Sequence, residues 1–362
     1  PGLQIVTTTL NGGYTSDGIN GTSFSAPYVS GIAALIRDYL PTATVREVKA
    51  RLINASQRGL DPANPAAART AGGRLDAASA FSVVPGPALV IQPAQTSSYA
   101  LQFSSGTVNV PVFDPVVVED GGNARLDPGE TATIRIALEN LWQSAANVRA
   151  TLSANNGVTV SGGAVSFGTI AAGAVQTGRF PVSVPAGLSG YRQIAFTLSI
   201  TADGGYTASR SFLLDVGRLA DGQTATQTFG SGLYDEFQTW VFDVASLPSG
   251  RNTLRIESTG SNDVDIFLRL AQPAQHNVDL DADIDLSEGD SLPFYYVNVP
   301  DAQRGDQSVD GNETVVIDTP QIGSYYVTVV NYDRAPGATY TLRARIDNSV
   351  LGREDGGGAV SP

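Results

Sequence analysis

Residues 20–36 read NGTSFSAPYVSGIAALI, a Gly-Thr-Ser turn that runs directly into an almost unbroken apolar segment. From Phe24 to Leu40 the apolar residues fall on every side of a helix, which predicts a helix buried all round. Ser23 lies at the first turn of this predicted helix, where backbone N–H groups have no intrahelical partner and the helix dipole is positive. A serine nucleophile needs such a field, whereas on the helix pattern alone an N-cap serine is the simpler interpretation.

Two further helices are predicted in the first 85 residues. Thr44 and Glu47 have the spacing of a capping box at the start of the first one. The apolar residues that follow fall on one helix face, namely Val45, Val48 and Leu52. Asp76 follows two glycines and is a favourable N-cap residue for the second one. The amino-terminal segment is therefore expected to be helical, with one amphipathic helix.

Residues 21–31, GTSFSAPYVSG, resemble the motif around the nucleophile of the subtilisin-like serine peptidases. The flanking sequences agree with this resemblance. Pro1, Gly2 and Ile5 resemble the segment ahead of the motif, and residues 73–77 (GRLDA) resemble the end of the catalytic domain. The resemblance implies that residues 1–85 belong to an α/β catalytic domain and that Ser23 is its nucleophile, with the N-cap geometry as part of that role.

The other catalytic residues of this family have no match in the chain. The family order is Asp, His and then Ser, so that the acid and the base both precede the serine. No histidine precedes Ser23, and Asp17 is not at the family's aspartate position. Asn11 and Asn20 are too close to Ser23 to match the asparagine that donates to the oxyanion. We therefore expect the carboxy-terminal piece of a catalytic domain, inactive alone, and we interpret the distant His276 as a solvated loop residue.

Composition limits the classes of function. With 362 residues the chain is expected to hold two or three domains. Its net charge of −13 is concentrated in residues 218–362, which hold 22 of the 35 acidic residues but nine of the 22 basic ones. This acidity argues against nucleic acid or anionic lipid as a partner, and no apolar run approaches the roughly 18 residues of a membrane span. Because the chain begins with Pro1 and has no methionine, we expect a processed product or a fragment.

The residue pattern of the sequence changes at residues 81–87 (FSVVPGP), where a helical pattern ends, and again at residues 216–223 (VGRLADGQ). Between and after these points, short runs rich in β-branched and aromatic residues alternate with turn clusters, as in an all-β sandwich. Three such runs are residues 131–138 (TATIRIAL), 195–200 (AFTLSI) and 325–330 (YYVTVV). The predicted fold is an α/β subtilisin-like fragment followed by two all-β sandwich domains, with domains 1–85, 86–217 and 218–347 and a flexible tail 348–362.

The β-rich segments carry two further resemblances. Residues 234–244, 260–268 and 323–330 resemble a pre-peptidase carboxy-terminal domain, a β-sandwich appended to secreted bacterial peptidases, although an acidic insertion at about 271–312 departs from it. Residues 120–130 (DGGNARLDPGE) resemble the start of immunoglobulin-like sandwiches in bacterial exoproteins. Both resemblances imply a secreted or extracellular protein of bacterial origin.

Two acidic stretches are candidates for binding Ca²⁺, which takes six to eight oxygen ligands. In the first stretch, four aspartates alternate so that all project to one face of an extended strand: Asp279, Asp281, Asp283 and Asp285. A solvated acidic loop is the simpler interpretation of this stretch. The second stretch contains Glu119, Asp120, Asp127 and Glu130, and turn formation is the simpler interpretation of it.

Two classes of function fit the sequence. The first is the carboxy-terminal part of a secreted serine endopeptidase that acts on protein or peptide substrates and is completed by the missing amino-terminal part of its catalytic domain. The second is a non-catalytic extracellular binding or structural protein made of β-sandwich modules. Under the first hypothesis, the strands that cover the helices lie mostly upstream. We therefore expect residues 1–85 alone to leave four apolar side chains without partners: Ile32, Val45, Val48 and Leu52.

Overall fold

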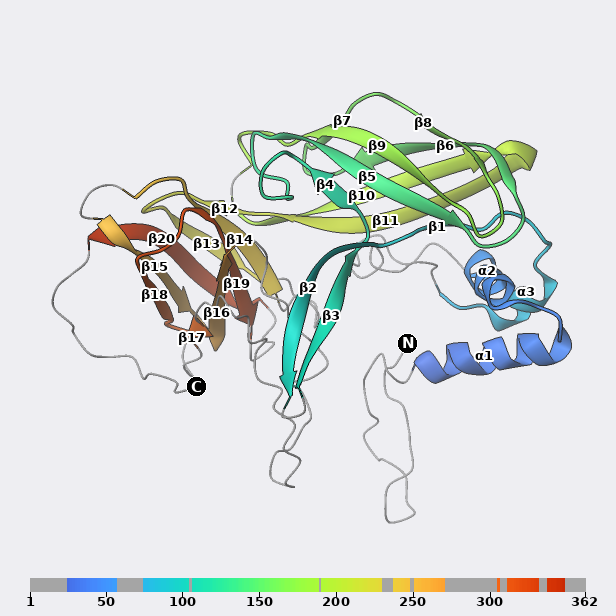
Figure 1. The fold of residues 1–362 in the computed structure, drawn as a ribbon, viewed down its shortest axis with the longest axis horizontal. Helices are drawn as coiled ribbons and strands as arrows, with labels where there is room; N and C mark the ends of the chain where they lie inside the picture. The colour runs from blue at the N-terminus through green and yellow to red at the C-terminus, as the bar shows by residue number, and fades with distance from the viewer. Residues whose placement is uncertain are drawn as a thin grey trace, which may run out of the picture.

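The computed structural model describes residues 25–56, 74–103, 106–188, 190–229, 237–247, 251–270, 305–306, 311–331 and 337–348. This part of the chain is mostly β-structure, with three α-helices at its amino-terminal end (Figure 1). The order agrees with a subtilisin-like helical segment followed by β-rich domains. The predicted strands at 131–138, 195–200 and 325–330 are all present, within β5, β10 and β19.

The helices are α1 (Ala26–Tyr39), α2 (Val45–Ala55) and α3 (Ala77–Ser82). Both predicted N-caps are confirmed. The Glu47 backbone N–H donates to Thr44 Oγ1 at 3.2 Å, and the Ser79 N–H donates to Asp76 Oδ1 at 2.9 Å. The Glu47 carboxylate accepts from Arg51 at 3.0 and 3.1 Å, which fixes the first turn of α2 to the next turn.

The prediction that the first helix is buried all round is wrong. Within α1, which the structure describes in full, Ile36 is the one buried residue. Tyr28, Leu35 and Tyr39 are 57–69% exposed. The three helices are too few to cover more than one side of α1, and the apolar pattern of a sequence does not reveal how many neighbours a helix has.

The expected set of unpartnered side chains is only partly present. Val45 is exposed, as predicted. Val48 is buried in a small core shared by the three helices, and Ile32 and Leu52 pack partly against it. This core also contains Ile36, Ala43 and Ala80. The prediction was therefore wrong for three of its four residues, because the helices pack against one another.

A first pair of sheets follows the helices and shares one hydrophobic core. One sheet runs in the order β1 (Leu89–Ile91), β5 (Thr131–Asn140), β9 (Val175–Ser183) and β7 (Thr159–Val160), with β4 (Val117–Glu119) also on β5. The other runs in the order β11 (Tyr206–Val216), β10 (Arg192–Ala202), β6 (Ala145–Ala154) and β8 (Val165–Ile170). Strands such as β5 alternate between buried and less buried residues, and the inward residues of both sheets meet in this core. A two-stranded sheet of β2 (Ala94–Phe103) and β3 (Gly106–Asp114) projects away from the pair (Figure 1).

A second pair of sheets has its own core. One sheet runs in the order β12 (Arg218–Leu219), β14 (Phe237–Val244), β19 (Gly323–Asn331), β16 (Val264–Leu270) and β17 (Gly305–Asp306). The other runs in the order β13 (Thr224–Thr228), β20 (Thr339–Asn348), β15 (Arg251–Gly260) and β18 (Thr314–Asp318). Between them the buried Trp240 Nε1 donates to Tyr340 Oη at 2.8 Å, and Tyr340 donates to Gln238 Oε1 at 2.7 Å. These bonds satisfy the polar atoms of two large aromatic side chains in the core.

The helices contact the first pair of sheets near Asn140, the last residue of β5. Its buried amide accepts from the backbone N–H groups of Ala88 and Trp142 and donates to the carbonyls of Gln143 and Ile170. On the helix side, the guanidinium of Arg51 lies 4.9 Å from the ring centroid of Trp142. The cation–π contact holds α2 against the loop that follows β5, and the Asn140 amide fixes that loop to the segment before β1.

The two pairs of sheets are joined through the loop 120–130. The Arg125 guanidinium lies 5.3 Å from the ring centroid of Tyr326, and its Nη2 donates to the carbonyls of Asp215 and Thr239. Tyr326 in turn donates to the Asn123 carbonyl at 2.6 Å. Burial of this hydroxyl raises the pKa of Tyr326 to about 12. Polar contacts from one loop thus fix the first pair of sheets to the second.

Candidate functional site

The candidate nucleophile Ser23 lies outside the described residues, which begin two positions later. α1 begins at Ala26 rather than at Phe24, and Ser25 is its N-cap residue, with Pro27 at the second helical position. The Ser25 side chain makes no capping bond to the helix. The first N–H groups of this 14-residue helix therefore keep the partial positive charge that favours an anion near its amino-terminal end.

The acidic loop candidates take part mostly in turn and ion-pair contacts. Glu119 accepts from Arg179 Nε at 3.0 Å and from Arg135 Nε at 2.8 Å. The hydrogen bond from Arg179 is the largest cause that lowers the pKa of Glu119, and the bond from Arg135 adds to it. Asp120 Oδ1 accepts from the N–H groups of Gly122 and Ala124, as expected for a turn. Both carboxylate oxygens of Glu119 therefore accept from arginines, one on β5 and one on β9.

The second half of the same loop is held from within and from the second pair of sheets. Glu130 Oε2 accepts from the Asp127 N–H at 2.9 Å, and Asp127 Oδ2 accepts from Asn123 Nδ2 and from Arg218 Nη1, both at 3.0 Å. Arg218 also pairs with Asp243 on β14. Burial raises the pKa of Glu130, and the negative charges of Asp120 and Asp127 raise it further.

The remaining sequence candidates lie outside the described residues: Asp279, Asp281, Asp283, Asp285 and His276. Among the described residues, no group of three or more His, Cys, Asp or Glu side chains could hold a metal ion. The calcium prediction for the four aspartates therefore stays a prediction.

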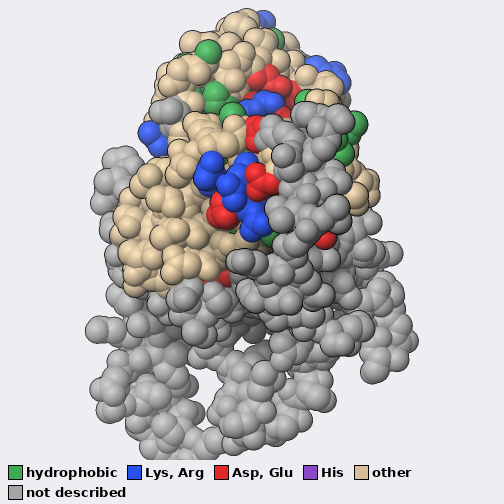
Figure 2. Space-filling model, turned by 90° about the vertical axis from the view of Figure 1, so that its left-hand side faces the viewer, with side chains coloured by type: hydrophobic (Ala, Val, Ile, Leu, Met, Phe, Trp, Pro, Cys, Tyr) green, Lys and Arg blue, Asp and Glu red, His purple; other side chains and the backbone are tan. Residues whose placement is uncertain are grey.

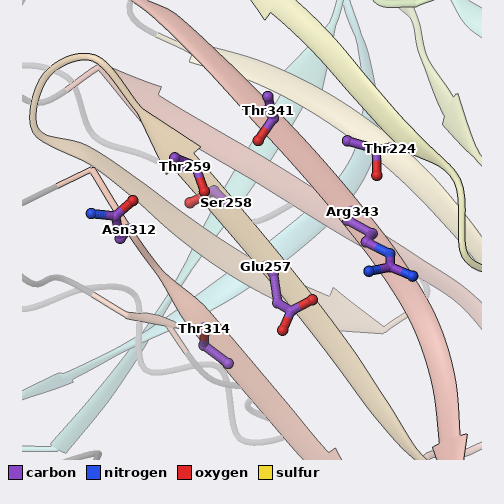
Figure 3. A pocket seen from close by; sticks show the side chains of 8 residues that line it. All are labelled: Thr224, Glu257, Ser258, Thr259, Asn312, Thr314, Thr341 and Arg343. Carbon is purple, nitrogen blue, oxygen red and sulfur yellow. The ribbon is translucent and has the colours of Figure 1, made fainter.

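A polar pocket of about 350 Å³ lies on the sheet of β13, β20, β15 and β18 (Figure 3). Four of its residues form one row across the strands, since Thr224 pairs with Arg343, Arg343 with Glu257, and Glu257 with Thr314. The other lining residues are Ser258, Thr259, Asn312 and Thr341. The pocket offers hydroxyl, amide and charged groups to a polar ligand, but no histidine to activate a nucleophile. The sequence did not reveal it, because the row depends on strand register.

Charged side chains of both signs lie on the same sheet as this pocket, on β15 and β20. Arg345 pairs with Glu257 at 3.2 Å and with Asp347 at 2.9 Å, and Arg255 pairs with Asp347 at 3.4 Å. Figure 2 shows basic and acidic side chains intermixed in one patch on a face of the molecule. Intermixed charges give no strong field of one sign, so these ion pairs do not create an attraction for polyanions.

Residues 21–31 and the helices that follow them resemble the serine peptidase type, and the rest of the described chain is β-rich. Residues 1–76 match the Subtilase family, which confirms the resemblance found in the nucleophile motif. This similarity establishes a relationship to serine peptidases, whose substrates are proteins or peptides. A search of curated proteins found no match.

Solved structures with similarity to the chain include peptidases and their accessory domains. The pre-peptidase C-terminal domain of a Bacillus anthracis collagenase is 18% identical, with a TM-score of 0.23, covering 36% of this chain and 93% of that domain. Tripeptidyl peptidase 2 is 15% identical, with a TM-score of 0.43, covering 90% of this chain. The secreted serine protease VesC from Vibrio cholerae is 10% identical, with a TM-score of 0.25, covering 77% of this chain and 67% of that one.

These TM-scores are too low to define a shared overall fold. The chain spans about a quarter of tripeptidyl peptidase 2, at 26% of its length. Within the part of the chain that the structure describes, no helix is long and apolar enough to cross a membrane.

Proposed function

We propose that this chain is the carboxy-terminal portion of a secreted bacterial subtilisin-like serine endopeptidase, with Ser23 as its nucleophile. The observation that carries the proposal is the match of residues 1–76 to the Subtilase family, in the segment that contains the Gly-Thr-Ser turn. The substrates are proteins or peptides. In this chemistry the serine Oγ bonds to the carbonyl carbon of the scissile peptide, its proton passes to a histidine, and the amine leaves with that proton.

The chain supplies only part of this machinery. No histidine precedes Ser23, so the base and the acid that orients it must come from a polypeptide that lies upstream in the family order. Without that base a serine hydroxyl is a poor nucleophile near neutral pH, and loss of triad members in such enzymes costs about 10⁴ to 10⁶ in turnover. We therefore expect this chain to be inactive alone.

The partner that completes the site is the amino-terminal part of the catalytic domain. Its strands would cover the large apolar side chains that α1 and α2 leave exposed, which are Tyr28, Val29, Leu35, Tyr39 and Val45. Large apolar side chains exposed to water favour association with a partner. Covering these side chains would also hold α1 in a fixed position.

The β-rich remainder is proposed to form two sandwich modules, over residues 86–217 and 218–347. Asn348, which the prediction placed in the tail, is the last residue of β20, and residues 349–362 lie outside the described residues. Two sheets that share one core are the arrangement of a β-sandwich, and each pair of sheets has such a core. α3 ends at Ser82 and β1 begins at Leu89, while β11 of the first pair ends at Val216 and β12 of the second begins at Arg218. The motif resemblance assigns the second module to the pre-peptidase carboxy-terminal type.

Calcium binding by the four aspartates of residues 279–285 belongs to the same proposal. Bound calcium stabilises a folded module by mass action, by about 2.7 kcal/mol at a hundredfold excess over the dissociation constant. Thermal unfolding with calcium, with magnesium and with a chelator tests this, and a midpoint indifferent to calcium contradicts it.

A non-catalytic extracellular binding protein is the second candidate, and the polar pocket of Figure 3 favours it. Protein hydrolysis separates the two candidates. A longer polypeptide that carries the upstream catalytic residues is expected to cleave a protein substrate, and Ser23→Ala is expected to abolish this. Ser25→Ala, in the same motif, is the matched control and should retain activity, because Ser25 makes no capping bond. Absence of cleavage by the longer polypeptide would favour the binding protein, whereas equal activity of the Ser23→Ala variant would contradict the assignment of Ser23 as the nucleophile.

A further inference from the structure

The loop 120–130 contains two carboxylate oxygens that are buried and lack a hydrogen-bond partner: Asp120 Oδ2 and Asp127 Oδ1. Asp127 as a whole is only 5% exposed. The other oxygen of each carboxylate is satisfied, in Asp120 by two backbone N–H groups and in Asp127 by Asn123 and Arg218. Both side chains are therefore held in place with one oxygen left over. A buried charged oxygen without a partner is costly, and an ion is one of the few groups that can satisfy it.

The charges near these two oxygens are unbalanced. Glu130 Oε2 accepts from the Asp127 N–H at 2.9 Å, so three carboxyl groups share this loop. The single positive charge of Arg218 is shared by two ion pairs, with Asp127 and with Asp243. Arg125 lies over the Tyr326 ring and donates to backbone carbonyls. The nearby arginines thus leave a local excess of negative charge, which favours a cation.

We propose that the loop 120–130 binds one Ca²⁺ ion through Asp120 Oδ2 and Asp127 Oδ1. The described residues hold no group of three acidic side chains arranged for a metal, so the remaining ligands are expected to be loop carbonyls, amide oxygens and water. All of these are oxygen donors in an irregular loop, a setting that suits calcium better than metals that prefer nitrogen or sulfur. This site is separate from the aspartates of residues 279–285, and it does not depend on the proposed peptidase activity.

Calcium at this position acts on the joint between the two pairs of sheets. The same loop supplies the Asn123 carbonyl that accepts from Tyr326, and Arg125, which reaches the carbonyl of Thr239 on β14. An ion that fixes Asp120 and Asp127 therefore also fixes the groups that hold the second pair of sheets. We expect calcium to set the rigidity of this joint.

Terbium luminescence tests the site, because Tb³⁺ replaces Ca²⁺ and is excited by a nearby tyrosine, here Tyr326. We expect the full chain to show tyrosine-sensitised emission that added Ca²⁺ displaces. Asp120→Asn should weaken binding at this site at least tenfold. Asp203→Asn, a carboxylate in the turn between β10 and β11 that accepts from Asn147, is the matched control and should bind as the parent does.

A second measurement keeps the test clear if the loop variant is less stable. Calcium should raise the midpoint of thermal unfolding of the parent and of a variant with all four aspartates of residues 279–285 changed to Asn. Calcium should raise the unfolding midpoint of Asp120→Asn by less than it raises that of the parent. Equal emission and equal calcium increments in Asp120→Asn and Asp203→Asn would overturn the proposal, as would a parent that binds no Ca²⁺ because water satisfies the two oxygens.

Discussion

Removal of the Asn140 side chain should destabilise the first pair of sheets more than any neighbouring change. The amide is fully buried and makes four hydrogen bonds to the backbone, two of them to Ala88 and Ile170, which are also fully buried. Asn140→Ala leaves these two backbone groups without a partner, at about 1–3 kcal/mol each. Water can reach the exposed Gln143, so its carbonyl adds little. The expected loss of unfolding free energy is therefore about 4 kcal/mol.

Urea unfolding followed by hydrogen exchange and mass spectrometry measures this loss for each pair of sheets separately. With a denaturant slope of about 2 kcal/mol/M, a loss of about 4 kcal/mol lowers the midpoint of the first pair by about 2 M. Gln143→Ala is the matched control, and as an exposed substitution it should stay within about 0.5 kcal/mol of the parent. The second pair should keep its midpoint in both variants. The reasoning fails if Asn140→Ala and Gln143→Ala unfold at the same urea concentration.

Three further results are expected. Tyr326 should ionise near pH 12 in an ultraviolet titration, and a normal titration of every tyrosine would contradict this. Because its folded pKa is raised, its contribution to stability should be full below about pH 10 and fall as the pH rises towards 12. Glu119 has a lowered folded pKa, so its contribution should be lost as the pH falls through that value, and Glu119→Gln should flatten the acid limb of a stability profile. Amides of α1 should exchange with solvent much faster than those of β19, since α1 has one buried residue and β19 is a central strand; uniform protection would argue against this.

Local features of the fold could be predicted from the sequence, whereas burial could not. The caps at Thr44 and Asp76 depend on side-chain oxygens and N–H groups three residues apart, so their spacing was sufficient. The strand at residues 131–138 was visible in its β-branched residues. The exposure of α1 depends on which elements lie beside it, and its apolar pattern carries no such information.

In the candidate sites too, local features could be predicted from the sequence, whereas contacts between distant residues could not. The turn at Asp120 was predicted from its residue types, and its Oδ1 makes the expected bonds to N–H groups. Which oxygens remain unpaired depends on Arg218, 91 positions from Asp127 in the sequence. The row from Thr224 to Thr314 similarly arises from the register of four strands that are far apart in the chain. Contacts of this range need the folded structure.

The role of Ser23 is tested most directly by labelling with a fluorophosphonate, which bonds to the oxygen of an activated serine. We expect the 362-residue chain to remain unlabelled, because no histidine precedes Ser23. A longer polypeptide with the upstream aspartate and histidine should gain one label, which peptide mapping places on Ser23 and which Ser23→Ala removes while Ser25→Ala does not. Labelling of the 362-residue chain at Ser23, or an active longer polypeptide labelled at another residue, would contradict the assignment.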